Sequence, residues 1–203
     1  MFVATRMSYL YTFCMLLTVN HHTHLEIIQT AHAEAMFQLI DKNRTYLREW
    51  LLFIDETKHL HDVEAYTRDA HERYLAKKEY AFAIFHEGTL AGRITLNIID
   101  QRNKTADIAY WLGEAFQGKG IMLQSCQALL AFGFKTLQLN RIEIRCDEAN
   151  RRSMAIPIKL HFTYEGTLRQ CKRMRDVYAD IQVYSLLHSE FDSWFNHNTS
   201  ASL

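Results

Sequence analysis

The spacing of hydrophobic residues divides the first part of the chain into a hairpin and three helices. Short apolar runs at residues 16–19 and 25–28 flank the polar stretch NHHTH, which predicts two strands joined by a turn. Residues 31–40, 45–54 and 62–78 place their apolar side chains three or four positions apart. That period is typical of amphipathic helices with one buried face.

The rest of the chain changes to a strand period, interrupted by two helices. Residues 80–86 and 90–98 read as two strands around a Glu87–Gly88 turn. The elements expected after them are strand 106–112, helix 121–137, strand 141–146, helix 153–160, and strands 162–168 and 177–187. A hairpin, a group of helices, a meander and a strand–helix–strand unit favour an α/β fold with a largely antiparallel sheet.

The length predicts a single domain, and the ends fall outside it. The chain has 203 residues and one proline, Pro157, with no low-complexity linker. We expect one domain over residues 15–191 and a C-terminal tail over 192–203. Residues 7–19 are apolar and faintly resemble a signal peptide, but they lack a small-residue cleavage site and are too short to span a bilayer. Residues 1–14 are interpreted as an extension, from an early start codon or as a disordered arm.

Charge and cysteine content exclude several classes of protein. Lysine and arginine together number 23, as do aspartate and glutamate, so the net charge is zero and nucleic acid is not expected as a direct partner. The four cysteines form no CxxC pair, which favours reduced thiols and no metal site. The histidines have no metal-binding spacing and are expected on the surface. Trp50, Tyr66 and Tyr74 are either core residues or the lining of a groove.

Three of the seven glycines lie in one short stretch, YWLGEAFQGKGIM, between a strand and a helix. Gly113, Gly118 and Gly120 allow a ligand to approach the backbone closely. The free amides and positive dipole end of the following helix form an anion site, to which Lys119 adds a charge. The stretch matches neither GxxxxGK[ST] nor GxGxxG, which disfavours a P-loop or dinucleotide-binding enzyme. A tight turn without a ligand is the alternative.

Four segments together carry a resemblance to a known family. They are DKNRTYLREW, NKTADIAYWLGEAFQGKGIM, LNRIEIRCDEANRRS and FTYEGTLRQ, in this order between Asp41 and Gln170. Together they resemble the GNAT superfamily of acyl-CoA-dependent N-acetyltransferases, and most closely its ribosomal-protein-serine N-acetyltransferase branch. The resemblance implies the GNAT fold, a mixed and mostly antiparallel sheet splayed between strands 106–112 and 141–146, with flanking helices.

The resemblance also implies acetyl-CoA as the co-substrate and assigns residues to it. The loop from Gln117 to Met122 matches the family's pyrophosphate-binding arm, with Met122 where the superfamily prefers Gly or Ala. The backbone of residues 111–113 would hold the pantetheine arm and the thioester. The residues implied at acetyl-CoA are Trp111, Leu112, Gly113, Gln117, Gly118, Lys119, Gly120, Ile121, Met122 and Asn150.

Ser153 matches the serine that this branch is thought to use as the proton donor to the leaving thiolate. The alternative is that Ser153 caps the following helix, because serine and asparagine favour such positions. Asn150 would bind the cofactor or order the turn. Direct attack of an amine on the thioester is implied, so Cys126 and Cys146 are not expected to act as nucleophiles.

Three residues depart from the branch. His161 stands where glycine is usual, at a helix end that requires a positive φ. Leu123 replaces a residue that commonly carries a hydroxyl. Lys172 occupies the position of a glutamate proposed as the general base, and a protonated lysine cannot accept a proton. Glu165 or a chain of water molecules is a replacement to consider.

The resemblance implies an enzyme that acetylates a primary amine, and most directly the N-terminal α-amine of a ribosomal or other protein. An α-amine with a pKa of about 7.7–8.0 is roughly one-tenth neutral at pH 7, so it depends little on a base. The alternatives are a small amine (a polyamine, aminonucleotide or toxin) as acceptor, or a degenerate protein that binds acyl-CoA or a partner without catalysis. A cytoplasmic location, no membrane partner and, by analogy, a homodimer are expected.

Overall fold

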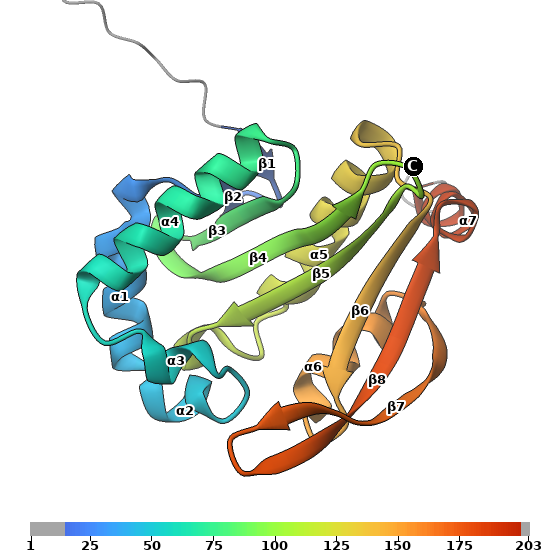
Figure 1. Cartoon of the computed structure of the whole chain (residues 1–203). Coiled ribbons are helices and arrows are strands. Elements are labelled where there is room, and N and C mark those ends of the chain that lie inside the picture. Colours follow the sequence, from blue (N-terminus) through green and yellow to red (C-terminus); the bar gives the residue numbers. More distant parts are fainter. Residues whose placement is uncertain (1–14, 200–203) are drawn as a thin grey trace, which may run out of the picture.

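A single eight-stranded sheet forms the centre of the computed structural model, which describes residues 15–199 (Figure 1). Its strand order is β1-β2-β3-β4-β5-β6-β8-β7, and every neighbouring pair is antiparallel except β5 and β6. The strands are β1 (Leu16–Thr18), β2 (Thr23–Ile27), β3 (Tyr80–His86), β4 (Thr89–Asp100), β5 (Thr105–Leu112), β6 (Arg141–Asp147), β7 (Thr163–Met174) and β8 (Val177–Leu187). The mostly antiparallel α/β sheet expected from the sequence is confirmed.

Helices cover both faces of this sheet. The α-helices are α1 (Ala33–Lys42), α2 (Arg44–Arg48), α3 (Phe53–Glu56), α4 (Leu60–Leu75), α5 (Ile121–Ala131), α6 (Arg151–Lys159) and α7 (His188–Thr199). Short 3-10 turns occur at η1 (Thr30–His32) and η2 (Glu114–Phe116), and α5 continues as one π-helical turn, η3 (Phe132–Thr136). Within the described residues, no helix combines the length and apolar character needed to cross a membrane.

Alternation along the strands separates two hydrophobic cores, one on each face. On β3, Phe82 and Ile84 face the core formed with α5, whereas Ala81 and Ala83 face the core formed with α1 and α4. The stripe predicted on residues 121–137 is confirmed, since Cys126, Leu129, Leu130 and Phe134 are at most 1% exposed. Each strand therefore presents alternate side chains to two separate helical layers.

The two parallel strands separate partway along their length. Their register runs from Thr105 opposite Arg141 to Ile108 opposite Ile144 and then stops, although β5 continues to Leu112 and β6 to Asp147. Figure 1 shows the two strands side by side near α7 and apart near α6. In the described chain, the edge of β5 beyond Ile108 that faces β6 has no strand partner.

The segment predicted as one helix, residues 45–54, is instead two short helices. The chain leaves α2 after Arg48 and begins α3 at Phe53, while Leu47 and Ile54 are both buried. Arg44 donates a hydrogen bond from Nη1 to the carbonyl oxygen of Ile54, at 3.1 Å, which folds α3 back onto α2. The apolar spacing was correct, but this side-chain contact to the backbone breaks the helix.

The C-terminal part holds more regular structure than the sequence predicted. Strand β7 continues six residues beyond 168, to Met174, across a change of register between Leu168 and Lys172. Its polar, exposed continuation carries no alternating apolar signal. Helix α7 follows β8 directly and crosses residue 191, where the domain was expected to end; Phe191 packs on Phe134 with ring centroids 5.0 Å apart.

Close approach of β4 and β5 requires the glycine at position 92. A Cβ built on Gly92 would lie 2.2 Å from the carbonyl oxygen of Trp111 and 2.9 Å from the Cα of Leu112. Both obstacles are backbone atoms, so the strands themselves would have to move. Because Gly92 pairs with Leu112, the displacement would fall on the part of β5 that pairs with β4 but not with β6.

We therefore predict that Gly92→Ala lowers the free energy of unfolding by about 2 kcal/mol, the usual cost of overpacking. Denaturant unfolding followed by circular dichroism measures this difference. Thr89→Ala, an exposed position on the same strand, is the control and should change stability by less than about 0.5 kcal/mol. Equal stability of the two variants would contradict the close packing of β4 on β5.

Candidate active site

A cavity of about 730 Å³ opens where β5 and β6 separate. Its walls come from both strands, the glycine-containing loop, the first turn of α5, the length of α6, the α2 region, β4 and β7. The charged residues that line it are Asp107, Arg145, Asp147, Arg152, Lys159 and Lys172. The aromatic residues that line it are Tyr46, Trp50, Tyr110, Trp111 and Phe116. Such a concave, mixed apolar and polar space is the usual form of a ligand site.

The glycine-containing loop supplies backbone donors at one end of this cavity. Gly118 and Gly120 have φ angles of +74° and +75°, a region that favours glycine. Gly120 is the N-cap of α5, and no side chain caps that end. The first-turn amides of α5 have no partner within the helix, so together with the helix dipole they form a site for an anion such as a phosphate.

Side chains from the α1–α2 region hold this loop in place. Gln117 donates from Nε2 to the hydroxyl of Tyr46 at 2.7 Å, and the amide of Glu114 donates to Oδ1 of Asn43 at 2.9 Å. Asn43 and Tyr46 belong to the DKNRTYLREW segment, and the loop belongs to the following segment. The two motifs found separately in the sequence are therefore parts of one structure.

Most of the residues assigned to the co-substrate line the cavity. They are Trp111, Leu112, Gln117, Gly118, Gly120, Ile121, Met122 and Asn150. Gly113 and Lys119 do not. The amide of Gly113 donates to the carbonyl oxygen of Ala91 at 2.9 Å, and the Lys119 ammonium lies 5.7 Å from the centre of the Phe116 ring. Gly113 is thus tied to β4, and Lys119 lies beside the Phe116 ring.

Asn150, and not Ser153, caps helix α6. Oδ1 of Asn150 accepts a hydrogen bond from the amide of Ser153 at 3.0 Å. The Ser153 hydroxyl is left for other contacts, and it lies 3.3 Å from the Tyr110 hydroxyl and 3.3 Å from Sγ of Cys146. The capping alternative for Ser153 is thus excluded by geometry, and its hydroxyl reaches the cavity from the start of α6.

The two side chains that the Ser153 hydroxyl contacts, Tyr110 and Cys146, resist ionisation. Burial raises the pKa of Tyr110 well above its ordinary value, and the Tyr110 hydroxyl donates to the backbone carbonyl of Ser153 at 3.0 Å. Burial also raises the pKa values of Cys126 and Cys146. Thiols that resist ionisation are poor nucleophiles. Cys126, Cys146 and Cys171 are free in the described chain, whereas Cys14 lies outside the described residues.

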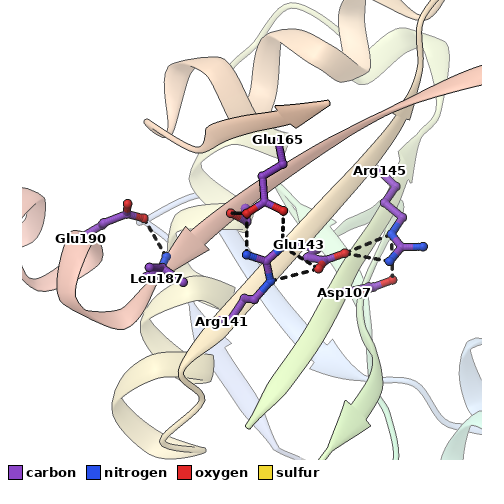
Figure 2. A network of polar contacts seen from close by, with 8 residues as sticks. Asp107, Arg141, Glu143, Arg145, Glu165, Leu187 and Glu190 are labelled. Atoms are coloured by element: carbon purple, nitrogen blue, oxygen red, sulfur yellow. Dashed lines mark hydrogen bonds and ion pairs between the residues drawn. The ribbon is translucent and has the colours of Figure 1, made fainter. Parts of the chain in front are cut away.

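The proposed replacement base, Glu165, does not line the cavity. Arg141 binds both carboxylate oxygens of Glu165, at 2.6 and 2.5 Å (Figure 2). The Ser185 hydroxyl donates to Oε1 of Glu165 at 2.7 Å. The hydrogen bonds from Arg141, followed by that from Ser185, lower the pKa of Glu165 to about 2. A carboxylate with so low a pKa and no access to the cavity is a poor proton acceptor.

Asp107 is a cavity residue that the sequence reasoning missed. It lies on β5, one residue before the last position that pairs with β6, and its side chain is 25% exposed. Burial raises the pKa of Asp107, an effect that Arg145 opposes. The signal in the sequence was a carboxylate within the otherwise apolar strand ADIAYWL. Alternation made it look like an ordinary solvent-facing position.

The other departures also have defined places. His161 has a φ of +60° just after α6, so the positive φ expected at this position is confirmed. Lys172 and Leu123 both line the cavity. Of the aromatic residues left open between core and groove, Trp50 lines the cavity, whereas Tyr66 and Tyr74 pack against the hydrophobic cores.

The tip of the β7–β8 hairpin ties two cavity walls together. Arg175 donates from Nε to Asp55 at 3.0 Å and from Nη2 to the carbonyl oxygen of Arg48 at 2.7 Å. Lys172 lies three residues before Arg175, and Leu47 and Trp50 flank Arg48 along the chain. These contacts join the β7 wall to the α2 wall on the side of the cavity away from α5.

Comparison with known proteins matches the fold and most of the chain. The family model described as acetyltransferase (GNAT) domain matches residues 23–163. Ribosomal-protein-serine acetyltransferase of Escherichia coli (strain K12) is 34% identical over 170 residues, which cover 82% of this chain and 93% of that protein.

Two solved structures are also similar to this chain. One is the RimL ribosomal L7/L12 alpha-N-protein acetyltransferase in complex with coenzyme A, with a TM-score of 0.84, 28% identity, and coverage of 87% of this chain and 99% of that one. The other is the microcin C7 self-immunity acetyltransferase MccE in complex with acetyl-CoA and AMP. Its TM-score is 0.81, with 28% identity and coverage of 83% of this chain and 94% of that one.

The Arg141–Glu165 contact should give stability that depends on pH. Because folding lowers the pKa of Glu165 from its usual value near 4.5 to about 2, its stabilisation is present above pH 4.5 and is lost as the pH falls towards 2. We predict that Glu165→Gln is less stable than the native protein at pH 7 by up to about 1 kcal/mol, since the pair is partly exposed. Unfolding at a series of pH values should show the difference closing below pH 4.5; a constant difference would contradict it.

Proposed function

The chain belongs to the acetyltransferase (GNAT) family, and we propose that it transfers an acetyl group from acetyl-CoA to the N-terminal α-amine of a protein. A ribosomal protein is the first acceptor to consider, because the E. coli relative and the RimL structure carry that activity in their names. The reaction is then a cytoplasmic one, in the compartment that holds ribosomes.

One observation carries the proposal: the unpaired edge of β5 and the free amides of the glycine loop border the same cavity. An exposed strand edge can accept and donate backbone hydrogen bonds to an extended amide chain, as a second strand would. The amides at the start of α5 can hold phosphates. The pantetheine and pyrophosphate parts of acetyl-CoA fit these two features in order.

The co-substrate supplies a thioester that an amine can attack directly, and this chain's residues position and protonate the groups involved. The amides at Gly118, Gly120 and Ile121 bind the pyrophosphate, and the β5 edge orients the pantetheine. The Ser153 hydroxyl is placed to give a proton to the thiolate as it leaves. The buried thiols Cys126 and Cys146 remain neutral and take no acetyl group.

The charges of the cavity favour some amines over others. Four of its charged side chains are cationic (Arg145, Arg152, Lys159 and Lys172) and two are anionic (Asp107 and Asp147). A polyamine would be repelled by this balance. An α-amine is roughly one-tenth neutral at pH 7, whereas a lysine amine is neutral about once in a few thousand molecules. Both arguments favour a protein N-terminus.

An aminonucleotide is the second candidate acceptor. The observation that favours it is the likeness to the MccE structure, which is in complex with acetyl-CoA and AMP. The basic residues of the cavity would also suit a phosphate-bearing acceptor. Competition between a peptide with a free N-terminus and AMP, measured as inhibition of peptide acetylation, separates the two candidates.

Acetyl-CoA binding is predicted to depend on the glycine loop. Gly120→Asp places a carboxylate at the phosphate site. The aspartate would also have to adopt the positive φ of Gly120, which residues with a side chain rarely do. Calorimetric titration should show micromolar binding by the native protein and a loss of at least about 100-fold in the variant, equivalent to about 2.7 kcal/mol. Unchanged binding by the variant would exclude the loop as the phosphate site.

Loss of the Ser153 hydroxyl is predicted to slow acetyl transfer by about 100-fold while leaving acetyl-CoA affinity within about threefold. The assay follows acetylation of a peptide with a free N-terminus and an internal lysine, with the modified position read by mass spectrometry. Acetylation should appear on the α-amine in the native enzyme. Full activity of Ser153→Ala would remove Ser153 from the mechanism.

A further inference from the structure

The cavity contains a carboxylate that is not engaged by any hydrogen bond. Within residues 15–199, Asp107 contacts the opposite charge of Arg145, whose Nε lies 3.9 Å from Oδ2. No described residue forms a hydrogen bond to the Asp107 carboxylate. Asp147, the other cavity carboxylate, accepts the amide of Ala149 at 3.0 Å and shapes the turn before α6. Asp107 is thus the cavity carboxylate of which neither oxygen accepts a hydrogen bond within the described residues, whereas Asp147 uses Oδ1 for its turn.

A charge network keeps Arg145 from neutralising Asp107. Figure 2 shows Arg145 turned towards Glu143, to which it donates from Nη2 at 2.9 Å and from Nε at 3.1 Å. Glu143 also binds Arg141 at 2.7 Å, and Arg141 binds Glu165. Asp107 is opposite Glu143 in the parallel register, at the cavity end of this network. The charge of Arg145 is therefore shared between Glu143 and Asp107, and its contact with Asp107 is the longer one.

Asp107 also lies on a different side of β5 from Ser153. Ile108 and Ala106 face the α5 core, and Tyr110, which shares their side by alternation, contacts Ser153 at the start of α6. Asp107 points to the other side of β5. Trp111, four residues later on the same side, packs in the core of α1 and α4. A group held between β5 and β6 would have Ser153 on one side and Asp107 on the other.

We propose that Asp107 is the catalytic proton acceptor for the attacking amine, a role that rests on the proposed acetyl transfer. The amine nitrogen forms a bond to the thioester carbon, and the C–S bond breaks with its electron pair on sulfur. The Asp107 carboxylate takes the proton that the amine loses. The Ser153 hydroxyl gives a proton to the sulfur and regains one from solvent. The base, Asp107, and the acid, Ser153, can then act on opposite sides of the thioester, and neither has to move.

This role accounts for the lysine at position 172. Lys172 lines the same cavity but carries a proton already, and Glu165 is bound by Arg141 outside the cavity. Burial raises the pKa of Asp107; the charges of Arg145 and Arg141 on β6 lower that pKa, and the charge of Glu143 raises it. Lys172 on β7 and Asn97 on β4 also line the cavity. A carboxyl pKa closer to neutral makes a more effective proton acceptor at physiological pH.

The test compares Asp107→Asn with the native enzyme in acetylating a peptide that has a free N-terminus. We expect kcat/KM to fall by about 100-fold, because even an amine that arrives neutral must lose a proton once it has attacked the thioester, while the Kd for acetyl-CoA stays within about threefold. The pH profile separates catalysis from structure. Below both the carboxyl and amine pKa values, log kcat/KM of the native enzyme should rise with a slope of about two, and that of the variant with a slope of about one.

Two further variants act as controls. Asp107→Glu keeps a carboxylate and should retain most of the pH dependence. Glu165→Gln removes a carboxylate from the same arginine network outside the cavity and should leave kcat/KM within about threefold.

Near-native turnover of Asp107→Asn, an unchanged acidic slope, or an equal loss in Glu165→Gln would overturn the role of Asp107 and leave the proposed function standing. A native enzyme that binds acetyl-CoA but acetylates no α-amine would instead overturn both.

Discussion

The end of pairing between β5 and β6 is the constraint on which the other features depend. Up to Ile108 and Ile144 the two strands are an ordinary parallel pair, and beyond them the backbone of β5 has no strand partner on its β6 side among residues 15–199. Unpaired backbone groups in a protein interior are costly unless something binds them. An extended amide chain placed between the strands supplies what the missing strand would have supplied. The opening is thus both a gap in the sheet and a binding surface.

Different parts of the sequence hold this opening in shape. The Gly92 backbone lets β4 approach the section of β5 that β6 does not pair with, and the ion pair between Arg141 and Glu165 joins β6 to β7 at the closed end. At the open end, Gln117 and Tyr46 fix the loop, and Arg175 joins the hairpin to the α2–α3 segment. The polar contacts among these fall outside the two hydrophobic cores, whereas Gly92 packs against Leu112 of one core. Packing therefore forms the sheet, and polar contacts together with the close approach at Gly92 determine the geometry of its opening.

The family resemblance implied the splayed parallel pair, whereas local patterns were sufficient to predict most of the strands, the glycine loop and a largely antiparallel sheet. Those features depend on alternation, on helical spacing and on glycine conformation, all of which are local. The break between α2 and α3 was not predictable in this way, because it depends on Arg44 reaching the carbonyl oxygen of Ile54. The second half of β7 was not predicted because most of its residues are polar and exposed, and only Met174 at its end is buried, so no alternation is visible.

The site shows the same division. Its glycines and Ser153 were found through motifs, whereas Asp107 required knowledge of which strand lies beside β5 and where the two separate. The sequence also suggested Glu165 as a base, and only the contact with Arg141 across the β6–β8–β7 sheet shows why it cannot serve. Charges acquire their roles from neighbours that are distant in the chain, and those neighbours are not visible in a local pattern.

Amide hydrogen exchange, measured with and without acetyl-CoA, tests the central claim most directly. Our account predicts slower exchange at the backbone amides of residues 109–112 and 118–122 when acetyl-CoA is bound, with little change in the closed part of the β5–β6 pair. Protection confined to other segments, or none along β5 beyond Ile108, would show that the opening in the sheet does not bind the co-substrate.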